Sequence, residues 1–294
     1  MKYINYLGFR IFIAVFYLIP FWLIYLLSDG LYYVLYYLVK YRRNIVKKNL
    51  EIAFPEWPEN ERKVLEKKFY RHLADIFMEG IKAINLSDKE TIRRYFITTP
   101  EAPNIPFRRG SACLFVGSHQ NNWEYGALGC GLQIEPIAMV FYKPIKNPLI
   151  NDYIRNSRKD KGTIMAPINE TSEYFEKYFD QHPMYIMISD QSPSNVRECH
   201  WVEFFGRETA VLHGPAKYAQ KCNLPIYLIK TEKQKRGFYK VSARLLIENP
   251  RDYQPEEISR IFTNEIEKQI REAPEYWLWS HKRWKRERIE KEKF

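Results

Sequence analysis

The 294-residue sequence has few cysteines, and they stand where no metal or redox motif forms. There are four of them, with no CxxC pair and no zinc-ligand spacing: Cys113, Cys130, Cys199 and Cys222. Cys199 is followed by His200, but two further ligands at a suitable spacing are missing. We therefore predict free, mostly buried thiols, no bound metal and no cofactor.

The sequence also lacks a recognisable DNA- or RNA-binding motif, although its formal net charge is +11. The basic residues concentrate in two places, 40–48 and the tail His281–Arg288. The first cluster directly follows an apolar segment, which favours anionic lipid headgroups over nucleic acid as its partner. A basic surface also attracts acidic proteins, and a solvated charged face is the plain alternative for the tail. We predict contact with membrane lipids and none with nucleic acid.

Charged residues are absent from Ile11 to Ser28. At about 1.5 Å per residue, a helix of this length extends about 27 Å, just enough for one bilayer crossing. The residues after Ser28 offer no A-x-A-like cleavage site, which disfavours a signal peptide, and a merely buried helix is the remaining alternative. The bases from Lys40 onward mark the cytoplasmic side of a membrane. We predict an N-terminal membrane helix and interfacial segment at 1–40, followed by a cytoplasmic-facing domain at 41–294.

No internal repeat or low-complexity linker divides the rest of the chain, so one domain is expected after the anchor. Residues 42–96 are expected to be helical, and a proline-rich link at 100–106 leads to the first strand. Apolar strands and helices then alternate, which predicts an α/β fold with a mixed, largely parallel sheet flanked by helices. The expected strands are 112–117, 136–142, 163–166, 184–189, 201–205, 225–230 and 238–246, and the expected helices are 122–130, 148–159, 169–179, 214–222 and 255–272.

A histidine and a glutamate follow the first expected strand, in the run Gly117-Ser118-His119-Gln120-Asn121-Asn122-Trp123-Glu124. Asn121 or Asn122 can cap the next helix, which puts His119 in the strand-to-helix turn and Glu124 in the first helical turn. Across that turn the carboxylate can fold back onto the imidazole, fix its tautomer and raise the basicity of the free nitrogen. The pair would then act as a general base on a hydroxyl. The alternative is a surface histidine with an unrelated acid nearby.

Active sites of such sheets lie beyond the carboxyl ends of the strands. His119 follows the first expected strand, and Asp190 follows the strand 184–189. We therefore expect both residues at the functional edge of the sheet.

Several further motifs accompany these residues in a fixed order. They are Asn49-Leu50-Glu51-Ile52-Ala53-Phe54-Pro55-Glu56 with Glu61-Arg62, Ser118-His119 with Glu124, Phe141-Tyr142-Lys143-Pro144-Ile145-Lys146-Asn147-Pro148, Arg158, Asp190-Gln191, Phe204-Phe205-Gly206, and 274–285. Together they resemble the late acyltransferases of lipid A biosynthesis, the lauroyl/myristoyl acyltransferase family, within the broader membrane acyltransferases with an H-x4-[DE] motif. The resemblance covers nearly the whole chain. It implies a glycerolipid-acyltransferase-like fold at the bacterial inner membrane, with the active site on the cytoplasmic side.

The resemblance implies transfer of a fatty acyl chain from an acyl carrier protein thioester to a hydroxyl of a lipid A precursor, a late acylation in lipopolysaccharide biosynthesis. His119 would remove the hydroxyl proton, and Glu124 would orient His119 and stabilise the imidazolium. Arg158 is the candidate for stabilising the oxyanion, with a surface ion pair as its alternative. Asp190 is the candidate for holding Arg158 or a substrate group, with a turn-forming role as its alternative. No serine or cysteine nucleophile is required, so we expect no acyl-enzyme.

Four basic residues flank the Asn147-Pro148 motif and are the candidates for docking the acidic carrier: Lys143, Lys146, Arg155 and Lys159. Contact of these bases with lipid phosphates is the competing interpretation.

Two other functions compete with this one: acylation of a different amphiphile, such as glycerol phosphate or an aminolipid, and an inactive membrane scaffold. The Phe204-Phe205-Gly206 run is expected to supply core packing and a tight turn. The cluster Trp277, Trp279 and Trp284 is expected in the core, in an acyl-chain groove or at the bilayer interface.

Overall fold

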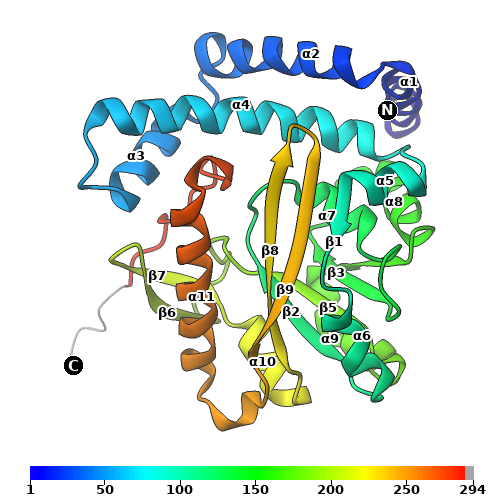
Figure 1. The fold of residues 1–294 in the computed structure, drawn as a ribbon, viewed down its shortest axis with the longest axis vertical. Coiled ribbons are helices and arrows are strands. Elements are labelled where there is room, and N and C mark those ends of the chain that lie inside the picture. Colours follow the sequence, from blue (N-terminus) through cyan, green and yellow to red (C-terminus); the bar gives the residue numbers. More distant parts are fainter. Residues whose placement is uncertain (289–294) are drawn as a thin grey trace.

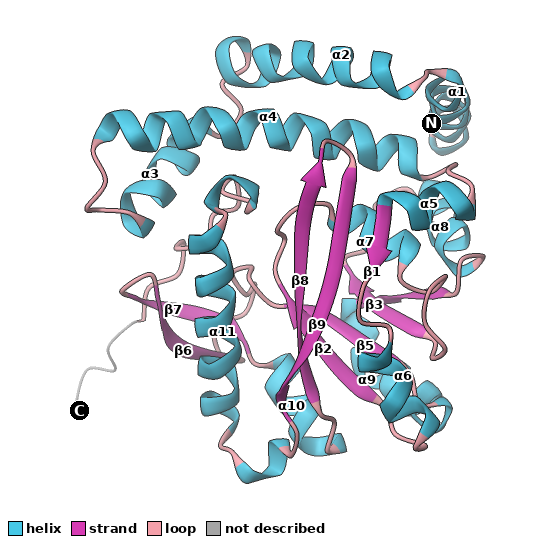
Figure 2. Ribbon diagram, in the orientation of Figure 1, coloured by secondary structure: helices cyan, strands magenta, loops and turns pink. Residues whose placement is uncertain are grey.

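The computed structural model describes residues 1–288, and a seven-stranded sheet forms its centre (Figures 1 and 2). The strand order is β1-β9-β8-β2-β5-β3-β4, and every neighbouring pair is parallel except the β8–β9 hairpin. The strands are β1 (Tyr95–Ile97), β2 (Cys113–Gly117), β3 (Ala138–Tyr142), β4 (Thr163–Pro167), β5 (Met184–Ile188), β8 (Ile226–Lys235) and β9 (Phe238–Ile247). A separate antiparallel pair joins β6 (Cys199–Phe204) and β7 (Arg207–Leu212). The predicted mixed, largely parallel α/β fold is confirmed.

Eleven α-helices surround the sheet within the described residues. They are α1 (Lys2–Leu18), α2 (Phe21–Tyr33), α3 (Arg43–Ala53), α4 (Glu59–Ala83), α5 (Asp88–Arg94), α6 (Glu101–Arg108), α7 (Trp123–Gly129), α8 (Pro148–Lys159), α9 (Thr171–Tyr178), α10 (Gly214–Cys222) and α11 (Pro255–Glu272). A π-helical turn, Val34–Leu38, continues α2. In Figure 1, α2 lies alongside α4 across one end of the molecule, and the β8–β9 hairpin reaches up to this pair.

The side chains of β2 point alternately to the two faces of the sheet, as strand geometry requires. Leu114 and Val116 belong to the larger core, which also contains Phe262 of α11. Cys113 and Phe115 belong to a smaller core on the other face. Both faces are covered, which explains why this strand is apolar throughout in the sequence.

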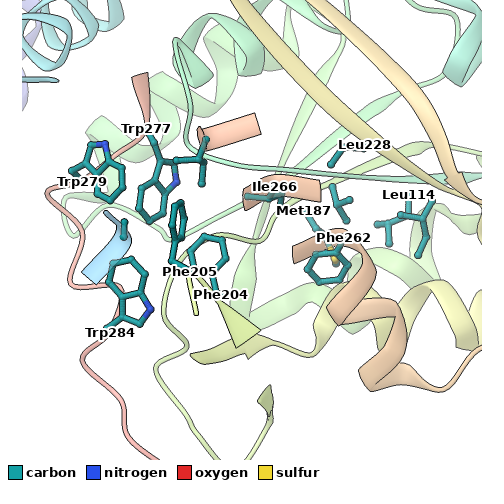
Figure 3. Close-up of a cluster of buried hydrophobic side chains, with 14 of the residues drawn as sticks. Leu114, Met187, Phe204, Phe205, Leu228, Phe262, Ile266, Trp277, Trp279 and Trp284 are labelled. Atoms are coloured by element: carbon teal, nitrogen blue, oxygen red, sulfur yellow. The ribbon is translucent and has the colours of Figure 1, made fainter. Parts of the chain in front are cut away.

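The C-terminal tryptophans lie in the core (Figure 3). The rings of Trp277, Trp279 and Trp284 are at most 7% exposed and pack against Phe204 and Phe205. Phe205 and Gly206 have positive φ angles of 54° and 67° and form the tight turn between β6 and β7. The expected packing role of this run is confirmed, and core packing is the interpretation that holds for the tryptophans.

The N-terminal apolar segment differs from its prediction, because the expected helix 11–28 is divided in two. The first helix ends at Leu18, the second begins at Phe21, and Ile19 between them is extended (φ −71°, ψ 123°). Pro20 explains the break, since proline has no N–H to donate and disfavours a helical conformation in the residue before it. Within the described residues one helix, Phe21–Leu38, is long and apolar enough to cross a membrane by length and composition.

Three short elements were missed by the sequence analysis: β7 (Arg207–Leu212), α6 and β1. The proline-rich link contains α6, with Pro100 as its N-cap and Pro103 in its first turn, where the missing N–H costs no helical bond. The strand β1 has only three residues and is held by parallel pairing with β9. Its existence depends on that distant partner, which local periodicity does not reveal.

Candidate active site

The order of the strands brings His119 and Asp190 together. β2 and β5 are parallel neighbours with Gly117 opposite Ile188, so each of these residues follows its strand at the same edge of the sheet. A backbone bond of 2.9 Å from Ser189 N–H to the Gly117 carbonyl continues the pairing beyond the strand ends. The expected position of both residues at carboxyl ends of strands is confirmed.

Asp190 holds His119 by two hydrogen bonds. The ring Nδ1 of His119 lies 2.7 Å from Asp190 Oδ1, and the backbone N–H of His119 donates to Oδ2 at 2.8 Å. A neutral imidazole must carry its proton on Nδ1 to donate to a carboxylate, so its Nε2 is left as a proton acceptor. The His119 side chain remains 21% exposed, against 2% for Asp190. The imidazole is thus fixed and partly exposed, and its Nε2 lies 3.3 Å from the side-chain nitrogen of Gln191.

The C-terminal segment supports this pair. Trp277 donates its indole N–H to Asp190 Oδ2 at 2.7 Å, and His281 Nε2 accepts the backbone N–H of Ser192 at 2.9 Å. Burial lowers the pKa of His281 to about 4, so it is a neutral acceptor near pH 7. The sequence analysis did not assign these roles to Trp277 and His281, although both lie in the motif 274–285. Both residues follow Asp190 by about 90 positions, so local spacing does not link them to it. The only signal in the sequence is that they belong to the same set of ordered motifs.

Two carboxylates act on the protonation of His119. Burial by itself lowers its pKa, but the charge and hydrogen bond of Asp190, and then the charge of Glu124, outweigh burial and raise the pKa above the ordinary value. Burial raises the pKa of Asp190, and the interaction with His119 and the bond from Trp277 reverse that shift and lower it. Asp190 is therefore ionised at neutral pH and stabilises the imidazolium.

Glu124 lies in the first turn of α7 as expected, but its contact differs from the predicted one. Its Oε2 accepts a hydrogen bond from Arg158 Nη2 at 2.5 Å, and no hydrogen bond joins it to His119 among residues 1–288. Arg158 extends from α8, and its side chain is 12% exposed against 38% for Glu124, so the ion pair is partly buried. We expected Glu124 to contact the imidazole, but Asp190 does so instead. We expected Asp190 to hold Arg158, but Glu124 does so instead. The four predicted residues form two ion pairs with exchanged partners.

The helix that carries Glu124 is fixed by Asn122. Its side-chain oxygen accepts the Tyr125 N–H at 2.9 Å, which confirms the predicted N-cap, and its Nδ2 donates to Glu79 Oε2 of α4 at 2.7 Å. Glu79 is fully buried and also accepts hydrogen bonds from Tyr25 and Tyr239. Burial raises the pKa of Glu79 to about 7. This carboxylate connects the N-terminal helices with the start of α7.

The turn between β2 and α7 is tied to the end of α11. Gln120 donates its side-chain N–H groups to the carbonyls of Gln269 and Ala273, each at 3.1 Å. Asn121 has a positive φ of 60°, and its backbone N–H donates to the Tyr276 carbonyl at 2.9 Å. Asparagine tolerates this left-handed conformation better than most residues. The turn that presents His119 is therefore held by the end of α11 and the segment that follows it.

An apolar cavity of about 100 Å³ lies beside His119 on the sheet face that faces α6 and α7. Ser118 and Gln120, the neighbours of His119, line it at one end, and Met184, the first residue of β5, lines it further along. Trp123 lines the cavity and packs edge-on against the His119 ring, with centroids 5.3 Å apart. Met184, Ile186 and Ile188 share one face of β5, so the cavity follows that strand for about 13 Å at roughly 3.3 Å per residue.

The predicted docking bases lie on the β3–α8 loop and on α8. Lys143, Lys146 and Lys159 are exposed, and Arg155 is half-buried, with Nη2 3.3 Å from the Tyr174 hydroxyl. Asn147, next to Lys146, donates its side-chain N–H to the Lys2 carbonyl of α1 at 3.2 Å. The loop is thus beside the N-terminal helices. Within the described residues, no group of three or more His, Cys, Asp or Glu side chains is arranged to hold a metal ion.

Comparison with known proteins tests the resemblance noted in the sequence. The sequence profile of the family described as "Bacterial lipid A biosynthesis acyltransferase" matches residues 1–286. The chain belongs to this family. It is therefore an acyltransferase, and the acyltransferase prediction is confirmed.

Individual relatives agree with this assignment. A lipid A biosynthesis lauroyltransferase of Escherichia coli is 26% identical over 283 residues, which cover 91% of this chain and 87% of that protein. A lipid A biosynthesis acyltransferase of Haemophilus influenzae is 25% identical over 244 residues, which cover 82% of this chain and 74% of that protein. The family match, over residues 1–286, includes the N-terminal helices, the sheet and most of the C-terminal segment rather than a single motif.

Proposed function

We propose that this acyltransferase moves a fatty acyl chain from the thioester of an acyl carrier protein to a hydroxyl of a lipid A precursor at the cytoplasmic side of the bacterial inner membrane. The observation that carries the proposal is the His119–Asp190 pair, in which Nε2 is left as a proton acceptor with a long 3.3 Å contact to Gln191 Nε2. The neighbouring Ser118 and Gln120 line an apolar cavity long enough for part of an acyl chain. Family membership supports the lipid A precursor as acceptor.

In the proposed reaction, His119 Nε2 takes the proton of the acceptor hydroxyl as its oxygen attacks the thioester carbonyl carbon. The new C–O bond forms, and the carbonyl oxygen becomes an oxyanion. The intermediate then collapses, the C–S bond breaks, and the thiolate of the carrier leaves with the proton from His119. Acyl ester and carrier thiol are the products, and no acyl-enzyme is needed.

The two carboxylates have different parts in this mechanism. Asp190 orients the imidazole and stabilises the imidazolium by direct contact, whereas Glu124 acts on the imidazolium through its charge and holds Arg158 by an ion pair. The guanidinium of Arg158 is the proposed stabiliser of the oxyanion. Pairing with Glu124 fixes the position of Arg158 before substrate binds, so little reorganisation is required during the reaction.

Mass spectrometry of lipids tests the proposed acceptor. Cells that lack the protein and then regain it should show lipid A heavier by one acyl chain, and an His119→Ala version should not restore that mass. A one-chain shift on a glycerolipid or an aminolipid would assign the enzyme to a different amphiphile. An unchanged lipid profile, with the protein present in the membrane, would favour the scaffold and contradict the proposal.

The carrier docking prediction concerns Lys143 and Lys146, which are exposed next to the site-bearing helix α8. Reversing both charges to glutamate is expected to raise the KM for the carrier-bound donor about tenfold and to leave kcat nearly unchanged, because docking is mostly uniform binding. The rise should shrink at high salt, where screening already weakens the encounter.

Lys177 and Lys221, on α9 and α10, supply the matched control with the same change in net charge. Their reversal to glutamate should leave the donor KM unchanged. If reversal at Lys143 and Lys146 instead raises only the acceptor KM, the two lysines contact lipid phosphates and the docking role is wrong.

A further inference from the structure

Both ends of α1 contact the body of the protein. At its start, Asn147 bonds the Lys2 carbonyl at 3.2 Å, and near its middle the rings of Phe9 and Tyr153 meet with centroids 5.8 Å apart. At its end, Lys82 of α4 donates to the Ile19 carbonyl at 2.7 Å. A helix that crosses about 30 Å of hydrocarbon must hold its two ends on opposite sides of the membrane. The contacts of α1 do not allow this.

The second helix is attached along its length as well. Tyr25 donates to Glu79 at 3.2 Å, and Ser28, which is fully buried, donates to Asp75 at 2.7 Å. Asp29 accepts from Arg236 of the β8–β9 hairpin at 2.6 Å. Beyond α2, in the π-helical turn, Tyr36 packs against Tyr70 of α4 with centroids 5.3 Å apart.

The partners of these contacts form a polar stripe on α4. Asp75, Glu79 and Lys82 are four and then three residues apart, so they share one face of that helix. They are at most 6% exposed, and each bonds a residue of the N-terminal segment. An ionised carboxylate or ammonium in bilayer hydrocarbon is costly, so this interface belongs to the protein interior rather than to lipid.

The outer faces of α1 and α2 are apolar and uncovered in the described residues. Leu7, Leu18, Trp22 and Leu26 are 62%, 78%, 70% and 60% exposed. Two basic residues, Lys40 and Arg42, follow this surface directly after α2 and its π-helical turn, and both are exposed. Apolar side chains next to bases are complementary to a leaflet that contains anionic lipids.

From these contacts we infer that α1 and α2 lie in the plane of one leaflet, as a two-helix surface on the body, and that the chain does not cross the bilayer. The inference rests on the proposed membrane association and replaces the single spanning helix expected from 11–28. It places both chain ends on the cytoplasmic side. It also positions the α8 helix, and thereby Arg158, close to the lipid surface, because α8 packs on α1 through Tyr153.

Protease protection of the full-length protein decides between the two topologies. The protein carries one epitope tag at the N-terminus and a different one at the C-terminus, and protease is added to intact Escherichia coli spheroplasts and to lysed ones. Both tags are expected to survive in intact spheroplasts and to be digested after lysis. A membrane protein with an outward-facing epitope must be digested in the same intact spheroplasts.

Digestion of the N-terminal tag alone in intact spheroplasts would overturn the inference and restore the spanning helix. Digestion of both tags would contradict the cytoplasmic location in the proposed function instead. The two failures are therefore distinguishable.

A variant tests whether the outer face itself binds lipid. Trp22→Glu combined with Leu26→Glu is expected to lower binding to vesicles of phosphatidylethanolamine and phosphatidylglycerol by about tenfold or more, because charged side chains replace two large apolar ones. The matched control is Phe96→Glu with Leu245→Glu, at positions 49% and 43% exposed on β1 and β9, and its binding should not change. Activity on acceptor dispersed in detergent shows that each variant is folded. Equal vesicle binding by both variants would contradict the inferred surface.

Discussion

Replacing His119 with alanine is expected to lower kcat by about 10²–10⁴-fold or more, because the acceptor hydroxyl then loses its general base. The fold should survive, since the His119 side chain is partly exposed and lies beyond the end of its strand. Turnover of purified protein with a carrier-bound donor measures the effect, and circular dichroism and vesicle binding monitor the structure. His213→Ala, a histidine at the start of α10, is the matched control and should keep normal turnover. Near-normal activity of His119→Ala would disprove the mechanism.

The same assay tests whether His119 and Glu124 act as a unit. Glu124→Ala should also be severely impaired, because it removes a negative charge that favours the imidazolium and leaves Arg158 without its partner. The double variant is then expected to be little worse than the worse single variant. Effects that multiply would indicate that the two residues contribute independently.

Asp190→Asn is the second change with a large expected effect, again about 10²–10⁴-fold in kcat. An amide in this position no longer selects the Nδ1–H tautomer, so part of the population presents a protonated Nε2 that cannot accept the hydroxyl proton. The charge that stabilises the imidazolium is lost as well. Purified Asp190→Asn with normal kcat would show that Asp190 does not position His119.

The pH profile separates this positioning role from a merely structural one. The base works only when His119 is neutral, so kcat/KM of the natural protein should fall as pH drops through the raised pKa of His119. Removing the Asp190 charge removes the main interaction that raises this pKa. The acid limb of the Asp190→Asn profile should therefore move to lower pH, together with the lower plateau. An unmoved acid limb would assign Asp190 to folding alone.

The sheet and its helices were predictable because their residues carry the signal themselves. The strand Cys113–Gly117 is a continuous apolar run, and α8, α10 and α11 begin at or next to a proline and keep helical spacing. Pro20 also signals a helix break in the sequence. The prediction of one helix relied on the hydropathy of 11–28 as a whole and did not use this signal.

The partners within the site were less predictable for a physical reason. Sequence spacing places Glu124 near His119, yet the contact between His119 and Asp190 depends on β2 and β5 being neighbours in the sheet. The strand order is a property of the whole fold, and it cannot be read from the residues around His119 or around Asp190 alone. The same holds for Glu124 and Arg158, which meet only because α8 crosses near the start of α7.

The bond from Trp277 to Asp190 has a consequence for how the protein is made. During synthesis α1 and α2 leave the ribosome well before Trp277 and His281 are added. The nascent chain can therefore reach the lipid surface well before Asp190 and its loop acquire their supports. A ribosome that stops short of residue 277 would release a chain that carries α1 and α2 but lacks the Trp277 hydrogen bond to Asp190. If α1 and α2 bind lipid as inferred, delivery to the membrane precedes completion of the His119–Asp190 pair.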